Sequence, residues 1–336
     1  MLVVTLYTRR DCHLCEVTRQ DLEAIRAELP HRLVEIDIES DPILHKTLLE
    51  QIPVVEVGPY RLKAPISRQS LRMTVGAASD RRTQLEDVGD AQYSKRIAKG
   101  RTVTGGDRFS FWISKHYLAF LNLFMLFYLG LPVLAPVLMK TGNVGAARVL
   151  YKLYSPLCHQ FAFRSFFLFG DQPFYSMEEA QVPGVATFES ATGITGVASP
   201  TSPSRLEARA YVGNEIVGYK VALCERDVSI YAALLLFGIM FAATGRRIKP
   251  LHWLVWIMLG LAPIGLDGFS QILSQFNWPW LSAVLPYRES TPQLRILTGF
   301  MFGLFTAWFA YPSMEASMLE ARQFLIKKFA VNRAEG

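Results

Sequence analysis

The chain has 336 residues, of which 51% are hydrophobic and only 19% are charged. Soluble domains carry about 25% charged residues, so this composition argues against an ordinary soluble enzyme, and it excludes disordered, collagen-like and small disulfide-rich chains. Lysines and arginines number 35 against 29 acidic residues, a formal net charge of +6. In so apolar a chain this mild excess favours the basic flanks of membrane spans, and no nucleic-acid partner is expected.

The first 80 residues alternate short apolar runs with helical patterns. Strands are expected at 3–7, 33–38, 54–57 and 60–63, where short runs rich in β-branched residues occur. Helices are expected at 12–29, from Pro42 to about Gln51, and from Ser67 onward, because apolar spacing or a capping residue marks each of them. The predicted order of this α/β domain, residues 1–80, is βαβαββα.

Two cysteines separated by two residues lie between the first strand and the first helix, and Pro53 precedes the third strand. This arrangement resembles the thioredoxin fold, and the stretch LYTRRDCHLCE at 6–16 is similar to a small glutaredoxin-like family. The resemblance implies that Cys12 is the nucleophile, that Cys15 resolves the mixed disulfide, and that Pro53 is a cis-proline beside them. It also implies a partner that offers a thiol or a disulfide.

The residues themselves suit that chemistry. A thiolate attacks a disulfide, and free amides at a helix N-terminus favour the thiolate. Arg9 and Arg10 add positive charge nearby, and Cys15 lies one helical turn after Cys12 on the same face. A half-zinc site and a degenerate scaffold are the alternatives, although one CxxC supplies only two of the four ligands of a structural zinc site.

A polar, basic linker is expected at 81–114, helical only in part. Four apolar runs then follow, at 117–139, 228–244, 251–266 and 296–311, and the third continues as a helix through Asp267 to Phe276. They predict an all-α membrane domain of about four transmembrane helices over residues 115–312.

Two segments of this region are less regular. Residues 150–170 are aromatic and apolar but include Lys152, His159 and Arg164, so an interfacial or re-entrant helix is expected, with a fifth span as the alternative. Residues 172–222 are interpreted as an insert, within which 191–204 is expected to be a flexible surface loop.

Basic residues set the expected orientation in the membrane. Arg246, Arg247 and Lys249 lie between the second and third spans, and Lys327 follows the fourth. Met1 leads directly into a strand without a basic stretch, so no secretory signal peptide is expected. These features predict a multi-pass cell-membrane protein in the lipid bilayer, with both termini cytoplasmic, a cytoplasmic tail at 313–336 and the insert outside.

Polar motifs gather near the outer ends of the spans. The motifs Cys158-His159-Gln160, Cys224-Glu225-Arg226-Asp227, Asp267-Gly268 and Glu289-Ser290-Thr291 with Arg295 resemble an uncharacterised membrane family called domain of unknown function 2085, over about residues 115–312. That family brings no activity with it.

Three interpretations of this outer cluster stay open. Cys158 and Cys224 could form a disulfide, or they could hold zinc together with His159 and either Asp267 or Glu289, which are ligand types that zinc accepts. Alternatively, the charged groups simply pair inside a helical bundle. The other polar members of the cluster are Arg226, Asp227, Gln271, Glu289 and Arg295.

Together these features predict a membrane-tethered thiol–disulfide oxidoreductase with a cytoplasmic CxxC and an extracytoplasmic Cys/His/Asp cluster. A transporter or binding protein with a regulatory glutaredoxin-like module is the second hypothesis, and a membrane metallo-hydrolase is the third. Zinc at the outer cluster is the one cofactor that the sequence suggests.

Overall fold

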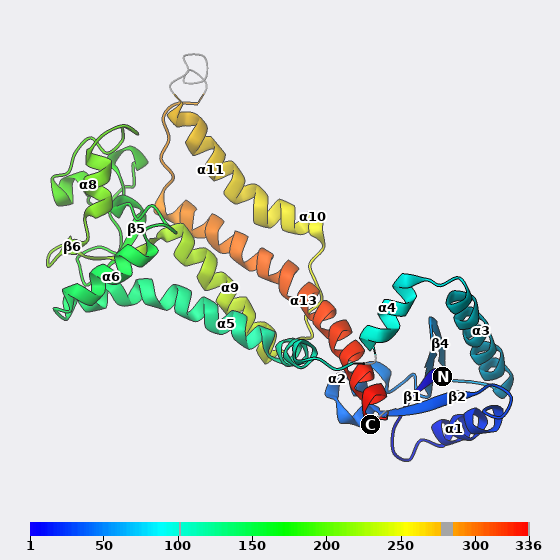
Figure 1. Cartoon of the computed structure of the whole chain (residues 1–336). Helices are drawn as coiled ribbons and strands as arrows, with labels where there is room; N and C mark the ends of the chain where they lie inside the picture. The colour runs from blue at the N-terminus through cyan, green and yellow to red at the C-terminus, as the bar shows by residue number, and fades with distance from the viewer. Residues whose placement is uncertain (101, 277–284, 335–336) are drawn as a thin grey trace. The chain divides into compact units, whose positions relative to one another are not determined.

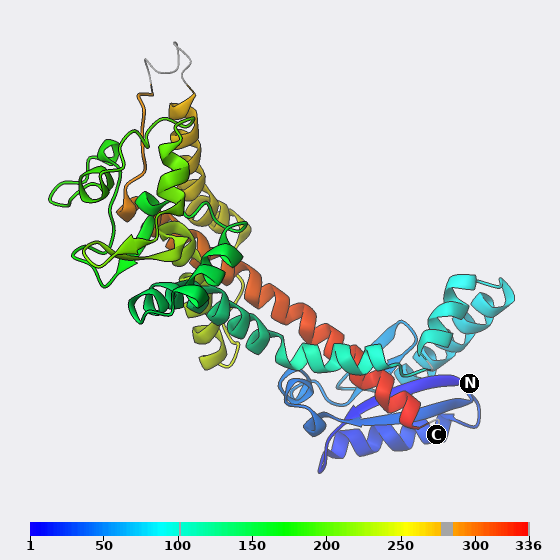
Figure 2. The same ribbon diagram turned by 60° about the vertical axis from the view of Figure 1, so that its left-hand side comes forward.

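In the computed structural model, residues 1–100, 102–276 and 285–334 are described, and the chain divides into two compact units. The thioredoxin-like unit joins Met1–His116 with Ala316–Gly336, and the membrane unit comprises Tyr117–Glu315. Figures 1 and 2 show a sheet surrounded by helices in the first unit and long helices in the second.

A four-stranded mixed sheet in the order β2-β1-β3-β4 forms the centre of the thioredoxin-like unit. Strand β1 pairs in parallel with β2 and antiparallel with β3, which pairs antiparallel with β4. The expected order βαβαββα is confirmed, with one short 3₁₀ turn added. The elements are β1 (Leu2–Thr8), α1 (His13–Ile25), β2 (His31–Asp37), η1 (Ile38–Ser40), α2 (Pro42–Leu48), β3 (Val54–Val57), β4 (Tyr60–Lys63) and α3 (Arg68–Asp87).

The expected helix starts are also confirmed. The Asp41 carboxylate accepts a hydrogen bond from the Ile43 amide and caps α2, and Ser67 caps α3 through the Ser70 amide. Such caps satisfy amides that have no partner within the helix. Helix α1 ends at Ile25, before the expected Leu29.

The C-terminal end of the chain folds into the thioredoxin-like unit. Helix α13 (Pro292–Arg333) continues well beyond its apolar run, and its Ile326 and Ala330 pack on the buried cluster around Ile36 and Leu44. The described part of the expected tail at 313–336 is therefore mostly helical, and its Arg322 and Lys327 pair with Asp41, the cap of α2, and with Glu56 of β3.

The expected linker is mostly helical. Helix α3 continues to Asp87, α4 spans Ala91–Gly100, and α5 (Gly105–Lys140) begins before the first apolar run. Local contacts such as the Arg82–Glu86 ion pair at 2.7 Å support helix in a polar sequence. The expectation of a linker at 81–114 that is helical only in part is therefore corrected, since most of its described residues are helical.

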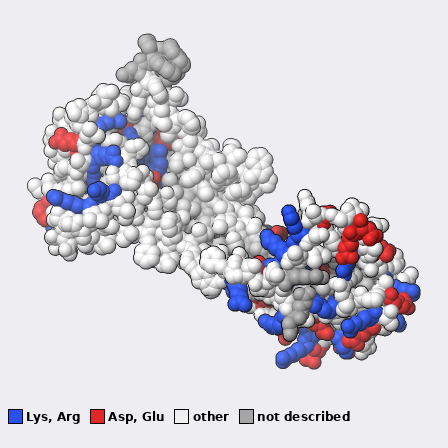
Figure 3. Space-filling view, in the orientation of Figure 1, with Lys and Arg blue, Asp and Glu red and all other residues white. Residues whose placement is uncertain are grey.

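Among the residues that the structure describes, four helices are long and apolar enough to cross a membrane: α5, α9 (Glu225–Ala243), the continuous stretch Trp253–Gln275 and α13. The third consists of α10 (Trp253–Val255), the π-helical turn η4 (Trp256–Leu261) and α11 (Ala262–Gln275). Large apolar side chains on these helices are exposed, Phe127 and Phe269 among them. Figure 3 shows few charged side chains over these helices on the face it presents. The four predicted spans are confirmed, and such apolar surfaces suit lipid.

Between α5 and α9 the chain forms a small lobe with an antiparallel sheet in the order β5-β7-β6. Its elements are α6 (Val144–Tyr154), η2 (Ala162–Arg164), β5 (Ser165–Leu168), η3 (Glu178–Ala180), α7 (Phe188–Thr192), α8 (Ser204–Ala210), β6 (Gly213–Asn214) and β7 (Gly218–Cys224).

This lobe corrects one expectation. Residues 150–170 form neither a re-entrant helix nor a fifth span, since they comprise a helix end, a turn and a strand. Two of their aromatic residues face protein, because Phe163 and Phe167 pack with Phe188 and Val197 of the insert. Within 191–204 the backbone is mostly irregular and half of the residues are exposed, although Val197 is fully buried.

Candidate functional site

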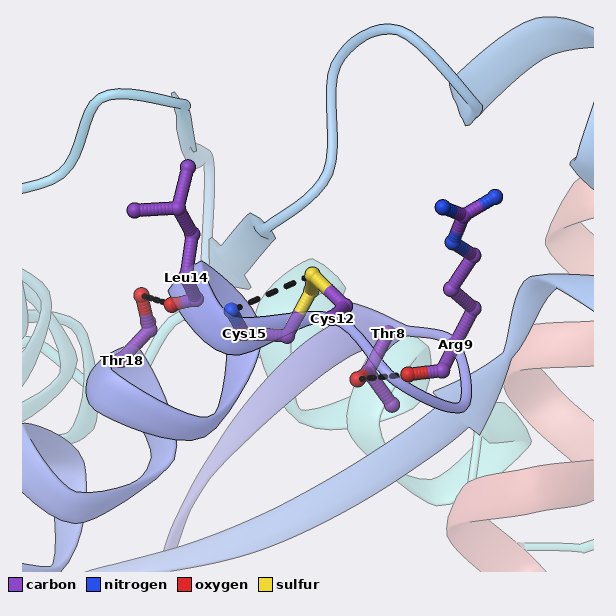
Figure 4. Close-up of a disulfide and its surroundings, with 6 residues drawn as sticks. All are labelled: Thr8, Arg9, Cys12, Leu14, Cys15 and Thr18. Carbon is purple, nitrogen blue, oxygen red and sulfur yellow. Dashed lines mark hydrogen bonds between the residues drawn. A yellow bond between two sulfur atoms is a disulfide. The ribbon is translucent and has the colours of Figure 1, made fainter.

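The first candidate site is the cysteine pair at the start of α1, where Cys12 and Cys15 form a disulfide (Figure 4). Cys12 caps the helix, and its Sγ accepts a hydrogen bond from the Cys15 amide at 3.2 Å. Cys15 is buried and Cys12 is half-buried. The sulfur that solvent reaches is therefore the one beside the free amides of the helix, where a thiolate is stabilised.

The surroundings of this pair are polar and nearly balanced in charge. A pocket of about 600 Å³ is lined by both cysteines and by three arginines and four acidic residues: Arg9, Arg10, Arg19, Asp11, Glu16, Glu35 and Asp37. Arg19 pairs with Glu16 at 2.6 Å and lowers the pKa of that carboxyl to about 2. Arginine charge is thus largely offset here, and the helix N-terminus is the main feature favouring a thiolate at Cys12.

Pro53 lies at the same edge of the sheet as the cysteine loop. The Ile52–Pro53 peptide bond is cis, and the next residue, Val54, pairs with Tyr7 near the end of β1. The loop carrying Cys12 leaves from that end of β1, so the topology brings Pro53 and the cysteine loop to one side of the sheet.

The second candidate site lies where the lobe meets α9. Cys224 ends β7 and caps α9, and its amide donates a hydrogen bond to the Cys158 Sγ at 3.3 Å. One ligand atom each of Cys158, Cys224 and Asp227 lie within 4.8 Å of one another. Both cysteines are free thiols. The structure thus brings the Cys158 and Cys224 thiols close to each other.

The two thiols ionise unequally. The hydrogen bond between them lowers the pKa of Cys158 and raises that of Cys224. Beneath them, Lys220 is fully buried, its Nζ donates to two backbone carbonyls, and burial lowers its pKa to about 7. Sequence reasoning missed Lys220, although a lone lysine in the apolar run 217–223 was a usable signal.

The carboxylates of the cluster form ion pairs with arginines and accept hydrogen bonds from other side chains. Asp267 pairs with Arg226 and with Arg288, the latter at 2.7 Å, and accepts a hydrogen bond from Ser290. Glu289 receives two hydrogen bonds from Arg164, at 2.7 and 2.8 Å.

Further contacts complete this network. Glu289 also pairs with Arg295 and accepts a bond from Gln271 at 2.7 Å, and Arg295 reaches Glu225 at 3.3 Å. The bundle-pairing interpretation therefore describes these residues well, because a buried charge is costly unless it is paired.

The geometry changes the expected zinc ligands. The Asp267 carboxylate is held by two arginines, and Asp227 takes its place beside the sulfurs. His159 lines the same pocket and its ring stacks on Phe161 at 5.8 Å. Sequence reasoning placed Asp227 among the general polar residues, although its position in the first turn after Cys224 was the signal.

Comparisons with known proteins find a separate match for each of the two parts of the chain. Residues 3–76 match the family model described as glutaredoxin-like domain (DUF836), and residues 215–309 match the one described as predicted membrane protein (DUF2085). An uncharacterized protein of Methanocaldococcus jannaschii is 24% identical over 208 residues, covering 60% of this chain and 93% of that protein. No solved structure matches the chain.

Proposed function

We propose that this protein is a membrane-tethered thiol–disulfide oxidoreductase whose reacting pair, Cys12 and Cys15, works on the cytoplasmic side. The observation that carries the proposal is the disulfide at the N-terminus of α1, in which the half-buried Cys12 lines an open pocket. The match of residues 3–76 to a glutaredoxin-like domain supports it.

The exchange follows from the placement of the two sulfurs. In the dithiol form, the Cys12 thiolate attacks a substrate disulfide, forms a mixed disulfide and releases one substrate thiolate. The Cys15 thiolate then attacks the Cys12 Sγ and releases the second substrate thiolate. Two electrons leave the protein, which ends with the Cys12–Cys15 disulfide present in the structure. A separate thiol reductant must restore the dithiol.

The membrane unit anchors this reaction at the bilayer. Cys158 and Cys224 take no part in it under this proposal, since in the proposed topology they belong to the opposite membrane face, about 30 Å of hydrocarbon away. Each arginine of the outer cluster already pairs with a carboxylate, which gives little support to an anion-transporting or anion-hydrolysing pocket. Loss of disulfide reduction on replacing Cys12 tests the proposal.

The proposed orientation makes a separate prediction. In a background without native cysteines, a Ser199→Cys variant should react with a membrane-impermeant thiol reagent in intact cells, because this exposed residue belongs to the outer lobe. A Thr83→Cys variant, equally exposed but on α3, should react only after lysis. The measurement is labelling before and after lysis. Labelling of Thr83→Cys in intact cells would reverse the proposed topology.

A further inference from the structure

Three soft or anionic donors converge at the junction of the lobe and α9. Cys158 follows α6 and is fixed by its amide, which donates to the Tyr154 carbonyl at 3.1 Å. Cys224 is fixed at the end of β7, and its Sγ accepts a hydrogen bond from the Asp227 amide. The three side chains thus come from two separate parts of the chain and are held there by backbone contacts rather than by chance proximity on a surface.

The donor types select a class of metal. Two thiolates exclude calcium and magnesium, which take oxygen ligands, and they suit zinc and related thiophilic ions. Mutual distances within 4.8 Å are compatible with a shared ion, since zinc–sulfur bonds are about 2.3 Å and zinc–oxygen bonds about 2.0–2.2 Å.

We propose that Cys158, Cys224 and Asp227 bind one zinc ion, with the fourth coordination position open to the adjoining pocket. That pocket has a volume of about 530 Å³ and is lined by all three donors. Three protein ligands with one open position are typical of zinc sites that bind an exchangeable fourth ligand, whereas structural sites are closed by four. His159 lies outside the group of converging donors and is not assigned as a ligand.

The backbone next to the donors is itself held in place. Lys220, on the same strand as Cys224, is fully buried, and its Nζ donates to the carbonyls of Gln160, two residues after Cys158, and of Arg209. The proposed zinc site uses residues other than Cys12 and Cys15. It can therefore be tested independently of the proposed disulfide exchange.

The test uses the full chain, purified in detergent under reducing conditions, exposed to zinc and freed of unbound ion. Metal analysis should find about one zinc per chain. The Cys158→Ser/Cys224→Ser double variant should lose the ion, and Asp227→Asn should weaken binding about 10- to 100-fold. Cobalt in place of zinc should give a thiolate charge-transfer band that the double variant lacks.

Matched controls come from the other cysteine pair. The Cys12→Ser/Cys15→Ser variant should keep the zinc, and because the chain has only four cysteines, zinc should then slow alkylation of the two that remain. His159→Ala should also keep it. Three outcomes would overturn the proposal: zinc retained by the Cys158→Ser/Cys224→Ser variant, a wild-type chain without stoichiometric zinc, or isolation of Cys158 and Cys224 as a disulfide.

Discussion

Replacing Cys12 by serine in the full chain should lower the rate of disulfide reduction by roughly 10³-fold or more, because the attacking nucleophile is lost. Cys15→Ser should instead accumulate a mixed disulfide between Cys12 and the substrate, since the first attack remains and its resolution does not. The reducing activity is measured with a small disulfide or a model disulfide protein, and the trapped adduct by mass spectrometry without reductant.

The Cys158→Ser/Cys224→Ser variant is the matched control, as it removes two thiols elsewhere and should leave the rate unchanged. A Cys12→Ser protein as active as wild type would disprove the assignment. The full chain is required because residues 316–336 complete the thioredoxin-like unit. A fragment ending near residue 85 would expose the cluster on which Ile326 and Ala330 pack.

Arg322→Ala should destabilise the thioredoxin-like unit by about 3–5 kcal/mol, the usual cost of leaving one member of a buried ion pair alone. The Arg322 guanidinium donates two hydrogen bonds to the Asp41 carboxylate, at 2.9 and 2.5 Å, and both side chains are nearly fully buried. The loss can be followed in a chain whose only cysteine is Cys15, since this buried thiol becomes reactive when the unit opens. The urea dependence of its alkylation then reports the free energy of unfolding.

Two further variants distinguish the loss of the buried ion pair from a general loss of stability on mutation. Arg19→Ala breaks exposed pairs on α1 and should change the stability little, because solvent screens such pairs. Combining Arg322→Met with Asp41→Asn removes both charges, while asparagine still caps α2, and should recover most of the stability. If Arg19→Ala and Arg322→Ala lowered the free energy of unfolding equally, burial of the Arg322–Asp41 pair would add nothing to its contribution to stability.

Local patterns were sufficient to predict the thioredoxin-like elements. Strands β3 and β4 match their predicted ranges, and Asp41 with Pro42 marked the start of α2, because cap chemistry and short apolar runs act within a few residues. Membrane spans were predictable for the same reason, since length and hydropathy are local properties. Helix α4 was not predicted, because it is short and mostly polar, although its half-buried Tyr93 and Ile97 have helical spacing.

The second candidate site was predictable only in part. That Cys158 and Cys224 would meet could be inferred from their positions at the outer ends of spans, and the structure brings them together. Which carboxylate joins them could not, because Asp267 and Asp227 are equivalent by residue type. Asp267 is not available to the sulfurs because it is paired with Arg226 and Arg288, which lie far from it in the sequence. Such pairing is set by tertiary packing and cannot be predicted from residue spacing along the chain.

Residues from both ends of the chain build one unit. The number of membrane crossings between those two ends must therefore be even. Asp41 and Arg322 can form their ion pair only if the residues before α5 and those at the end of α13 are on the same face of the bilayer. Every odd number of crossings would separate them, so a chain that failed to insert one helix would also fail to complete its thioredoxin-like unit. Completion of that unit by Ile326 and Ala330 therefore depends on an even number of inserted helices between α5 and the end of α13.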